Sequence, residues 1–203
     1  MMNGLLLKRI AVGLGMLAAM AAGGCADDGD GASSANGGTA GEPSGGGGAP
    51  PSAPFDGCSK GELEPDREGR LELAGPGVDA GTGALKPGSY LVSTTYLAMK
   101  PEMAPTMTEL SGPVMESLFT MKGLVAVAAT SSSSCAAVRT LTVWESELDM
   151  YAFVGSPAHV KAMGQASSIS RGTSNVISWE GSEREATWEE AAKRLGSEVG
   201  GDI

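Results

Sequence analysis

The chain has 203 residues, of which 24 are acidic and 14 basic, giving a formal net charge of −10. An acidic chain without clusters of lysine and arginine does not neutralise a phosphate backbone, so nucleic acid is excluded as the main partner. Beyond the N-terminus no apolar run is long enough to cross a bilayer, which excludes a polytopic membrane protein.

Residues 1–24 have the pattern of an export signal. Lys8 and Arg9 form a short basic segment, and the run from Ile10 to Ala22 contains only Gly, Ala, Met, Leu, Val and Ile. This run is too short to span about 30 Å of hydrocarbon, but it has the length of a signal-peptide core. It ends in Ala22-Gly23-Gly24-Cys25, which resembles the lipobox of bacterial lipoproteins. We therefore expect an acyl chain on Cys25 and a place in the bacterial cell envelope; the alternative is an ordinary secretory signal.

Residues 25–54 have the composition of a flexible tether. Positions 26–54 contain nine Gly and four Pro, and no Leu, Ile, Val, Phe, Met, Tyr or Trp. Such a segment buries too little apolar surface to offset its chain entropy. Its r.m.s. reach is about 30 Å, enough to hold a domain away from a membrane. Because the processed chain is strongly acidic, we expect the acyl anchor alone to hold it at anionic lipid.

Two cysteines remain if Cys25 carries lipid. Cys58 and Cys135 form an even pair in an oxidising compartment, so we predict a disulfide that pins residues 55–87 onto the folded domain. Two separate thiols are the alternative. A metal site is not expected, because two distant cysteines and one histidine lack the spacing of zinc ligands.

The extension at residues 55–87 is rich in turns and contains one weak strand at 71–73. After it the folded domain spans 88–195, followed by a tail at 196–203. Runs of β-branched, aromatic or alternating apolar residues predict strands at 89–97, 124–129, 138–144 and 175–180. In the third of these, Arg139, Leu141 and Val143 should point to one face and Trp144 to the other.

A helix is predicted over residues 101–121, with a kink or restart at Gly112-Pro113. Its apolar positions recur at the helical period and include several methionines: Met103, Met107, Leu110, Val114, Leu118 and Met121. Methionines can line an adaptable ligand pocket, but a stripe at this spacing is more typical of core.

Later helices begin at recognisable N-caps. Ser146 to Asp149 match a capping box, and Ser156 precedes a proline at the first helical position. These signals predict helices from Ser146 to about Gly155 and from Ser156 to Met163. A last helix is predicted from Thr187 to Leu195.

The predicted order is β-α-β-β-α-β with a C-terminal helix, which is an α+β, ferredoxin-like arrangement. An antiparallel sheet with helices on one face leaves its other face uncovered. A second copy packed sheet to sheet would cover it, so we expect a homodimer, a dimeric α+β barrel.

The segment from Thr140 to Glu147, with Ala152 to Val154 and the stretch from Ser156 to Met163, resembles antibiotic-biosynthesis-monooxygenase-like proteins of the dimeric α+β barrel superfamily. The resemblance covers about residues 88–195. It implies a cavity between helices and sheet for a small hydrophobic or aromatic substrate, oxidised without a flavin, metal or other cofactor.

The resemblance places Trp144 and His159 as candidate catalytic residues. Haem-degrading relatives also use an Asn, where this chain has Ser93 to Thr95. His159 would act as a general base, since it is the only histidine and titrates near neutral pH; a plain helix histidine is the alternative. Trp144 would stack on a planar ligand or belong to the core. Arg139 should pair with a carboxylate, for which Glu145 is the candidate.

Two functions therefore stay open. One is an exported lipoprotein that oxidises a small aromatic or quinol-type substrate. The other is a non-catalytic envelope lipoprotein that binds a small hydrophobic ligand or a protein partner.

Overall fold

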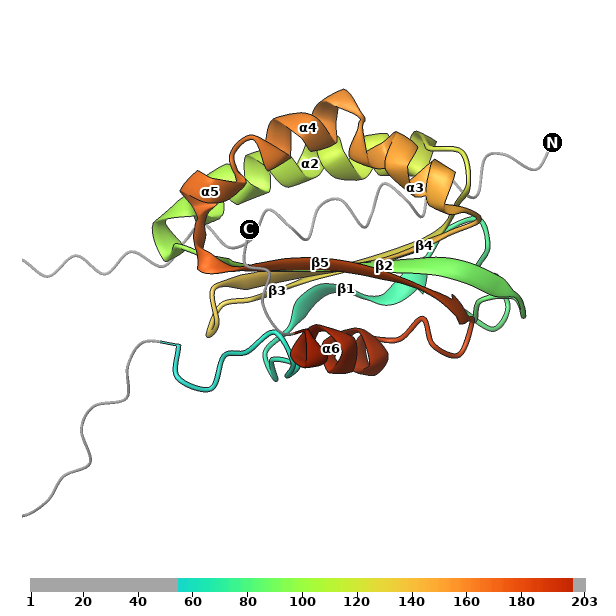
Figure 1. Cartoon of the computed structure of the whole chain (residues 1–203), viewed down its shortest axis with the longest axis horizontal. Helices are drawn as coiled ribbons and strands as arrows, with labels where there is room; N and C mark the ends of the chain where they lie inside the picture. The colour runs from blue at the N-terminus through green and yellow to red at the C-terminus, as the bar shows by residue number, and fades with distance from the viewer. Residues whose placement is uncertain (1–54, 199–203) are drawn as a thin grey trace, which may run out of the picture.

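A computed structural model describes residues 55–198 of the chain (Figure 1). The predicted signal segment, Cys25 and the tether lie outside these residues. Five antiparallel strands form one sheet in the order β1-β3-β4-β2-β5. The strands are β1 (Glu68–Ala74), β2 (Ser89–Met99), β3 (Leu124–Ser132), β4 (Ala137–Trp144) and β5 (Ser170–Ser182). The helices are η1 (Pro101–Met103), α2 (Ala104–Thr120), α3 (Glu147–Val154), α4 (Pro157–Met163), α5 (Ala166–Ile169) and α6 (Trp188–Ser197).

The expected α+β fold is confirmed. From β2 onward the chain runs strand, helix, two strands, helices and strand, and the spatial order β3-β4-β2-β5 is that of a ferredoxin-like sheet. The weak strand predicted at 71–73 lies within β1, which extends the sheet beside β3. No helix within residues 55–198 has the length and apolar character to cross a bilayer.

The helix starts follow their caps. Ser146 Oγ accepts a hydrogen bond from Asp149 N at 3.2 Å, and Ser156 and Thr187 cap α4 and α6 in the same way. Of the two alternatives predicted at Gly112-Pro113, a restart of the helix does not occur, since α2 continues through Pro113 as one element. The side chains along α2 pack onto two apolar clusters at opposite ends of the sheet, as the core interpretation of the methionine stripe required.

The second face of the sheet is covered by the chain itself. Figure 1 shows α6 on the side opposite to α2, α3 and α4. Trp188 and Ala191 of α6 join a buried cluster with Val92, Leu141 and Trp179 of the sheet. Parts of the extension pack against the same cluster. We expected a homodimer because one face of the sheet should be uncovered. The structure does not leave that face uncovered, so this argument for a homodimer no longer applies.

The extension is also fixed by a covalent bond and a buried ion pair. Cys58 and Cys135 form the predicted disulfide, across 77 positions of sequence. Arg139 is paired with Glu64, with 2.9 Å between Nε and Oε2. The pairing with Glu145 was therefore predicted wrongly: Glu145 is exposed, whereas the extension brings Glu64 directly over Arg139.

The Arg139 guanidinium uses its remaining donors on the backbone of the extension. It donates to the carbonyl oxygens of Ser59, Lys60 and Glu62 at 2.6–3.0 Å. Its carbon lies 4.4 Å from the centre of the Tyr96 ring. Both charged side chains are almost completely buried, so this network determines the path of residues 59–64.

Candidate functional site

Trp144 is part of the core. It ends β4, has no exposed surface, and lies among Leu118, Met150 and Phe153. Its Nε1 donates to Thr142 Oγ1 at 2.9 Å, and its ring stacks on Phe153 with 5.6 Å between centroids. In this arrangement the indole has neither a free face nor a free donor for a ligand.

His159 lies on the other side of Phe153. Its ring meets Phe153 edge-on at 4.8 Å, and Nδ1 lies 3.1 Å from the carbonyl oxygen of Val154. Because a carbonyl only accepts, Nδ1 carries the proton and the Nε2 lone pair is left unprotonated. Burial lowers the pKa of His159 from 6.5, against the opposing effect of the Val154 hydrogen bond. The imidazole is therefore neutral at physiological pH.

The two candidate catalytic residues thus belong to one aromatic row, Trp144, Phe153 and His159. The row is continuous, but Phe153 separates its two ends. Only His159 is accessible, and only in part. The structure therefore joins these residues by packing and does not present them together to a substrate.

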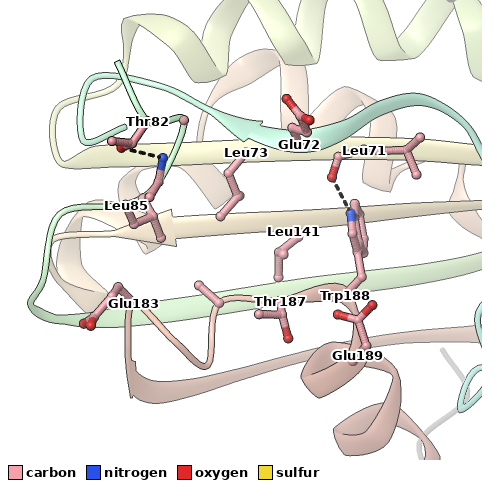
Figure 2. Close-up of a pocket in the computed structure, with 13 residues that line it drawn as sticks. Leu71, Glu72, Leu73, Thr82, Leu85, Leu141, Glu183, Thr187, Trp188 and Glu189 are labelled. Carbon is pink, nitrogen blue, oxygen red and sulfur yellow. Dashed lines mark hydrogen bonds between the residues drawn. The ribbon is translucent and has the colours of Figure 1, made fainter. Parts of the chain in front are cut away.

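A groove lies on the opposite face of the sheet, between β1 and the start of α6. Its volume is about 440 Å³. Figure 2 shows Leu71 and Glu72 of β1 across from Trp188 and Glu189 of α6, with Leu141 between them. Trp188 Nε1 donates to the Leu71 carbonyl oxygen at 2.7 Å, and this hydrogen bond holds the start of α6 against β1.

The lining of the groove combines apolar side chains with carboxylates. Leucine, alanine and tryptophan side chains supply the apolar part, and Glu72, Glu183 and Glu189 supply three negative charges. The lining contains no lysine, arginine, histidine or cysteine. Glu72 and Glu189 form no salt bridge within the described residues. The groove therefore presents uncompensated negative charge beside an apolar surface.

Glu183 stands at the same end of the groove as Thr82 and Leu85 (Figure 2). Its Oε2 accepts a hydrogen bond from Gly88 N at 3.1 Å. This bond lowers the pKa of Glu183, so the carboxylate stays ionised at neutral pH. Nε of the neighbouring Arg184 lies 3.6 Å from Glu183 Oε1, and the Arg184 side chain is 89% exposed to solvent.

The described residues offer no metal centre. Within residues 55–198, no three His, Cys, Asp or Glu side chains are grouped so that they could hold a metal ion. The three carboxylates of the groove accordingly do not converge on one point. They suit an extended organic cation better than a metal ion.

Sequence reasoning did not find this groove. Its walls come from segments far apart in the chain: Trp188 and Leu71, which close it together, are 117 positions apart. No local motif marks such a site. The only available signal was the tryptophan at the first position of the last helix, next to two glutamates.

No family model matches this chain, and no curated protein matches it in sequence. Its fold is similar to several solved structures, one of which is named an antibiotic biosynthesis monooxygenase. Rv0793 from Mycobacterium tuberculosis has 11% identity and a TM-score of 0.42, over 44% of this chain and 92% of that one. SO0527 from Shewanella oneidensis has 9% identity and a TM-score of 0.43, over 48% and 96%. An antibiotic biosynthesis monooxygenase has 11% identity and a TM-score of 0.42, over 45% and 97%. These likenesses carry no residue role or activity over to this chain.

Proposed function

We propose that this protein is an exported, lipid-anchored binding protein of the bacterial cell envelope, whose groove takes a small organic cation with an apolar body. The anchor is supported by the signal-like residues 1–24, the cysteine at position 25 and the Gly/Pro-rich segment that follows. Such a protein would hold its ligand outside the cytoplasm without converting it.

The observation that carries this proposal is the chemistry of the groove lining. An apolar ligand body is stabilised by removal from water against Leu71, Leu141 and Trp188. An ammonium or guanidinium group on that body then meets the Glu189 carboxylate. Glu72, whose carboxylate points away from Trp188 in Figure 2, adds negative potential at the edge of the groove. An anionic ligand is repelled by the same carboxylates. The groove is therefore selective for charge as well as for size.

The lining is suited to binding and not to covalent catalysis. Thr82 and Thr187 supply hydroxyls, but neither has a histidine, lysine or cysteine beside it in the groove to activate it. Thr187 Oγ1 accepts the Glu190 N–H at the start of α6, and Thr82 Oγ1 accepts from Ala84 N. Both hydroxyls are thus engaged in holding the walls of the groove.

Hexylamine and hexanoate, which share one alkyl chain and differ in charge, test this proposal. We expect hexylamine to raise the melting temperature of the protein in a concentration-dependent way, and hexanoate to leave it unchanged. The double variant Glu72→Gln/Glu189→Gln should bind hexylamine at least tenfold more weakly by calorimetry. Glu68→Gln/Glu198→Gln changes two exposed glutamates outside the groove lining and should bind as the unmodified protein does. Equal stabilisation by both probes, or unchanged affinity in the first variant, would contradict the assignment.

A second candidate function is supported by the state of His159. Its neutral imidazole with an unprotonated Nε2 is the form that a general base needs, and oxidation of a quinol-type substrate begins with loss of a proton. Oxygen uptake with a quinol or polyphenol, abolished in His159→Ala, would identify this activity. Full turnover in that variant would remove His159 from the mechanism.

A further inference from the structure

Exposed apolar side chains gather on α3 and α4. Seven large hydrophobic residues are exposed in the described part of the chain, and five of them belong to these two helices. We call these five the α3–α4 patch: Leu148, Tyr151, Val154, Val160 and Met163. Leu148 is 80% exposed and Tyr151 57%. Single exposed leucines are ordinary, whereas a group of this size on two neighbouring helices indicates an interaction surface.

The outward direction of the patch follows from what the helices bury. Met150 and Phe153 point inward and pack against Leu118 and Trp144, so the residues at positions 148, 151 and 154 face away from the core. α4 lies beside α2 and has no fully buried residue. α3 is thus apolar on both sides, and its outer side has no partner among residues 55–198.

Charge is spread unevenly around the patch: three acidic residues, Glu145, Glu147 and Asp149, flank Leu148 at the start of α3. From Met150 to Gln165 the only charged residue is Lys161, which is basic and exposed, although the chain carries a net charge of −10. The part of the patch from Tyr151 to Met163 therefore meets less electrostatic repulsion at an anionic surface than the start of α3 does.

The described chain begins at one end of the sheet, on the side of α6 in Figure 1. Phe55, the first described residue, packs against a cluster that includes Met99 and Ile169, and its ring lies 3.8 Å from the Arg171 guanidinium. Ile169 ends α5, the helix that directly follows α4. The predicted tether joins the domain at Phe55, and the r.m.s. reach of about 30 Å expected from its composition brings Cys25 within range of the patch.

We propose that the α3–α4 patch rests on the surface of the lipid bilayer that carries the anchor; this inference depends on the lipid anchor of the proposed function. The aliphatic side chains of the patch would enter the interfacial region, with the Tyr151 hydroxyl at the level of the headgroups. Because the tether keeps the domain at a high local concentration near the membrane, a patch with weak intrinsic affinity for lipid is sufficient to keep the domain on the bilayer surface. The acyl chain and the patch together then hold the domain in one orientation, with the groove on the opposite side of the sheet.

Vesicle flotation of the processed chain, residues 25–203 with Cys25→Ser, isolates the patch from the acyl chain. We expect this protein to float with an excess of phosphatidylcholine vesicles. Leu148→Ser/Val160→Ser should lower the partition coefficient at least tenfold. Leu71→Ser/Val176→Ser removes two exposed apolar side chains outside the patch and should change it less than twofold.

Absence of flotation, or an equal loss in both double variants, would overturn the proposal. So would a dimer in solution that Leu148→Ser/Val160→Ser dissociates, because the patch would then be occupied by a second copy. The anchor is tested separately, by measuring the intact mass of the exported protein for acylation at Cys25. If the exported protein is not acylated at Cys25 but the Cys25→Ser protein floats, the lipid anchor is contradicted and the membrane-binding patch is supported. If the exported protein is acylated but the Cys25→Ser protein does not float, only the proposal for the patch is contradicted.

Discussion

Replacing Glu64 with alanine is expected to lower the free energy of unfolding by about 3–5 kcal/mol. The reason is that Arg139, whose side chain is 2% exposed, would be left buried with a positive charge and no carboxylate. A domain of this size is stabilised by only about 5–15 kcal/mol in total, so the loss is large. Urea denaturation followed by tryptophan fluorescence measures it directly.

Glu62→Ala is the matched control, since the exposed side chain of Glu62 lies in the same segment and only its backbone oxygen contacts Arg139. It should change the stability by less than about 0.5 kcal/mol. In the double variant Glu64→Leu/Arg139→Met no charge remains buried, so the loss should be smaller than in Glu64→Ala. A Glu64→Ala protein as stable as Glu62→Ala would show that the ion pair does not hold the extension.

Removing the disulfide is expected to cost about 4.5 kcal/mol in the chain-entropy model, because the bond joins residues 77 positions apart. Alanine is the suitable replacement, since Cys135 packs among the apolar side chains of Tyr96, Ala98 and Leu195. The variant Cys58→Ala/Cys135→Ala should keep the sheet from β2 to β5. The amide protons of residues 59–66 should lose protection from hydrogen exchange.

Cys25→Ala serves as the control for loss of a thiol and should leave the unfolding midpoint unchanged. A stability loss below about 1 kcal/mol in the double variant would mean that the non-covalent contacts of the extension are sufficient alone. The two perturbations, Glu64→Ala and loss of the disulfide, act on one segment, so their combined effect should differ from the sum of the two.

Local patterns predicted most of the fold. Ser146, Ser156 and Thr187 mark helix starts because a capping side chain acts on backbone groups only three residues away. The alternation around Arg139 and Leu141 likewise gives the two faces of β4 from adjacent positions. The disulfide followed from counting cysteines. Each of these inferences needed only a short window or a small number of candidates.

Apart from the restart expected at Pro113, the incorrect predictions concern pairs that are distant in sequence. Glu64 lies 75 positions from Arg139, and nothing in the intervening sequence favours it over the nearer Glu145. The position of α6 on the second face depends on Trp188 and on the extension it packs with, which is also a long-range contact. The groove arises from that same packing, so it could not be predicted without the fold. The candidate residues Trp144 and His159 were found from a resemblance, but burial limits what Trp144 can contact.

The disulfide also determines where a mechanical load enters the domain. Tension on the chain ahead of residue 55 travels through Cys58 into Cys135, at the turn that precedes β4. The covalent path thus bypasses the backbone between the two cysteines, which includes β1, β2 and β3. β4 is the central strand of the sheet, so the pull acts on a strand that is hydrogen-bonded on both sides, to β3 and to β2. The proposed lipid anchor would therefore load the central strand of the sheet and not its edge.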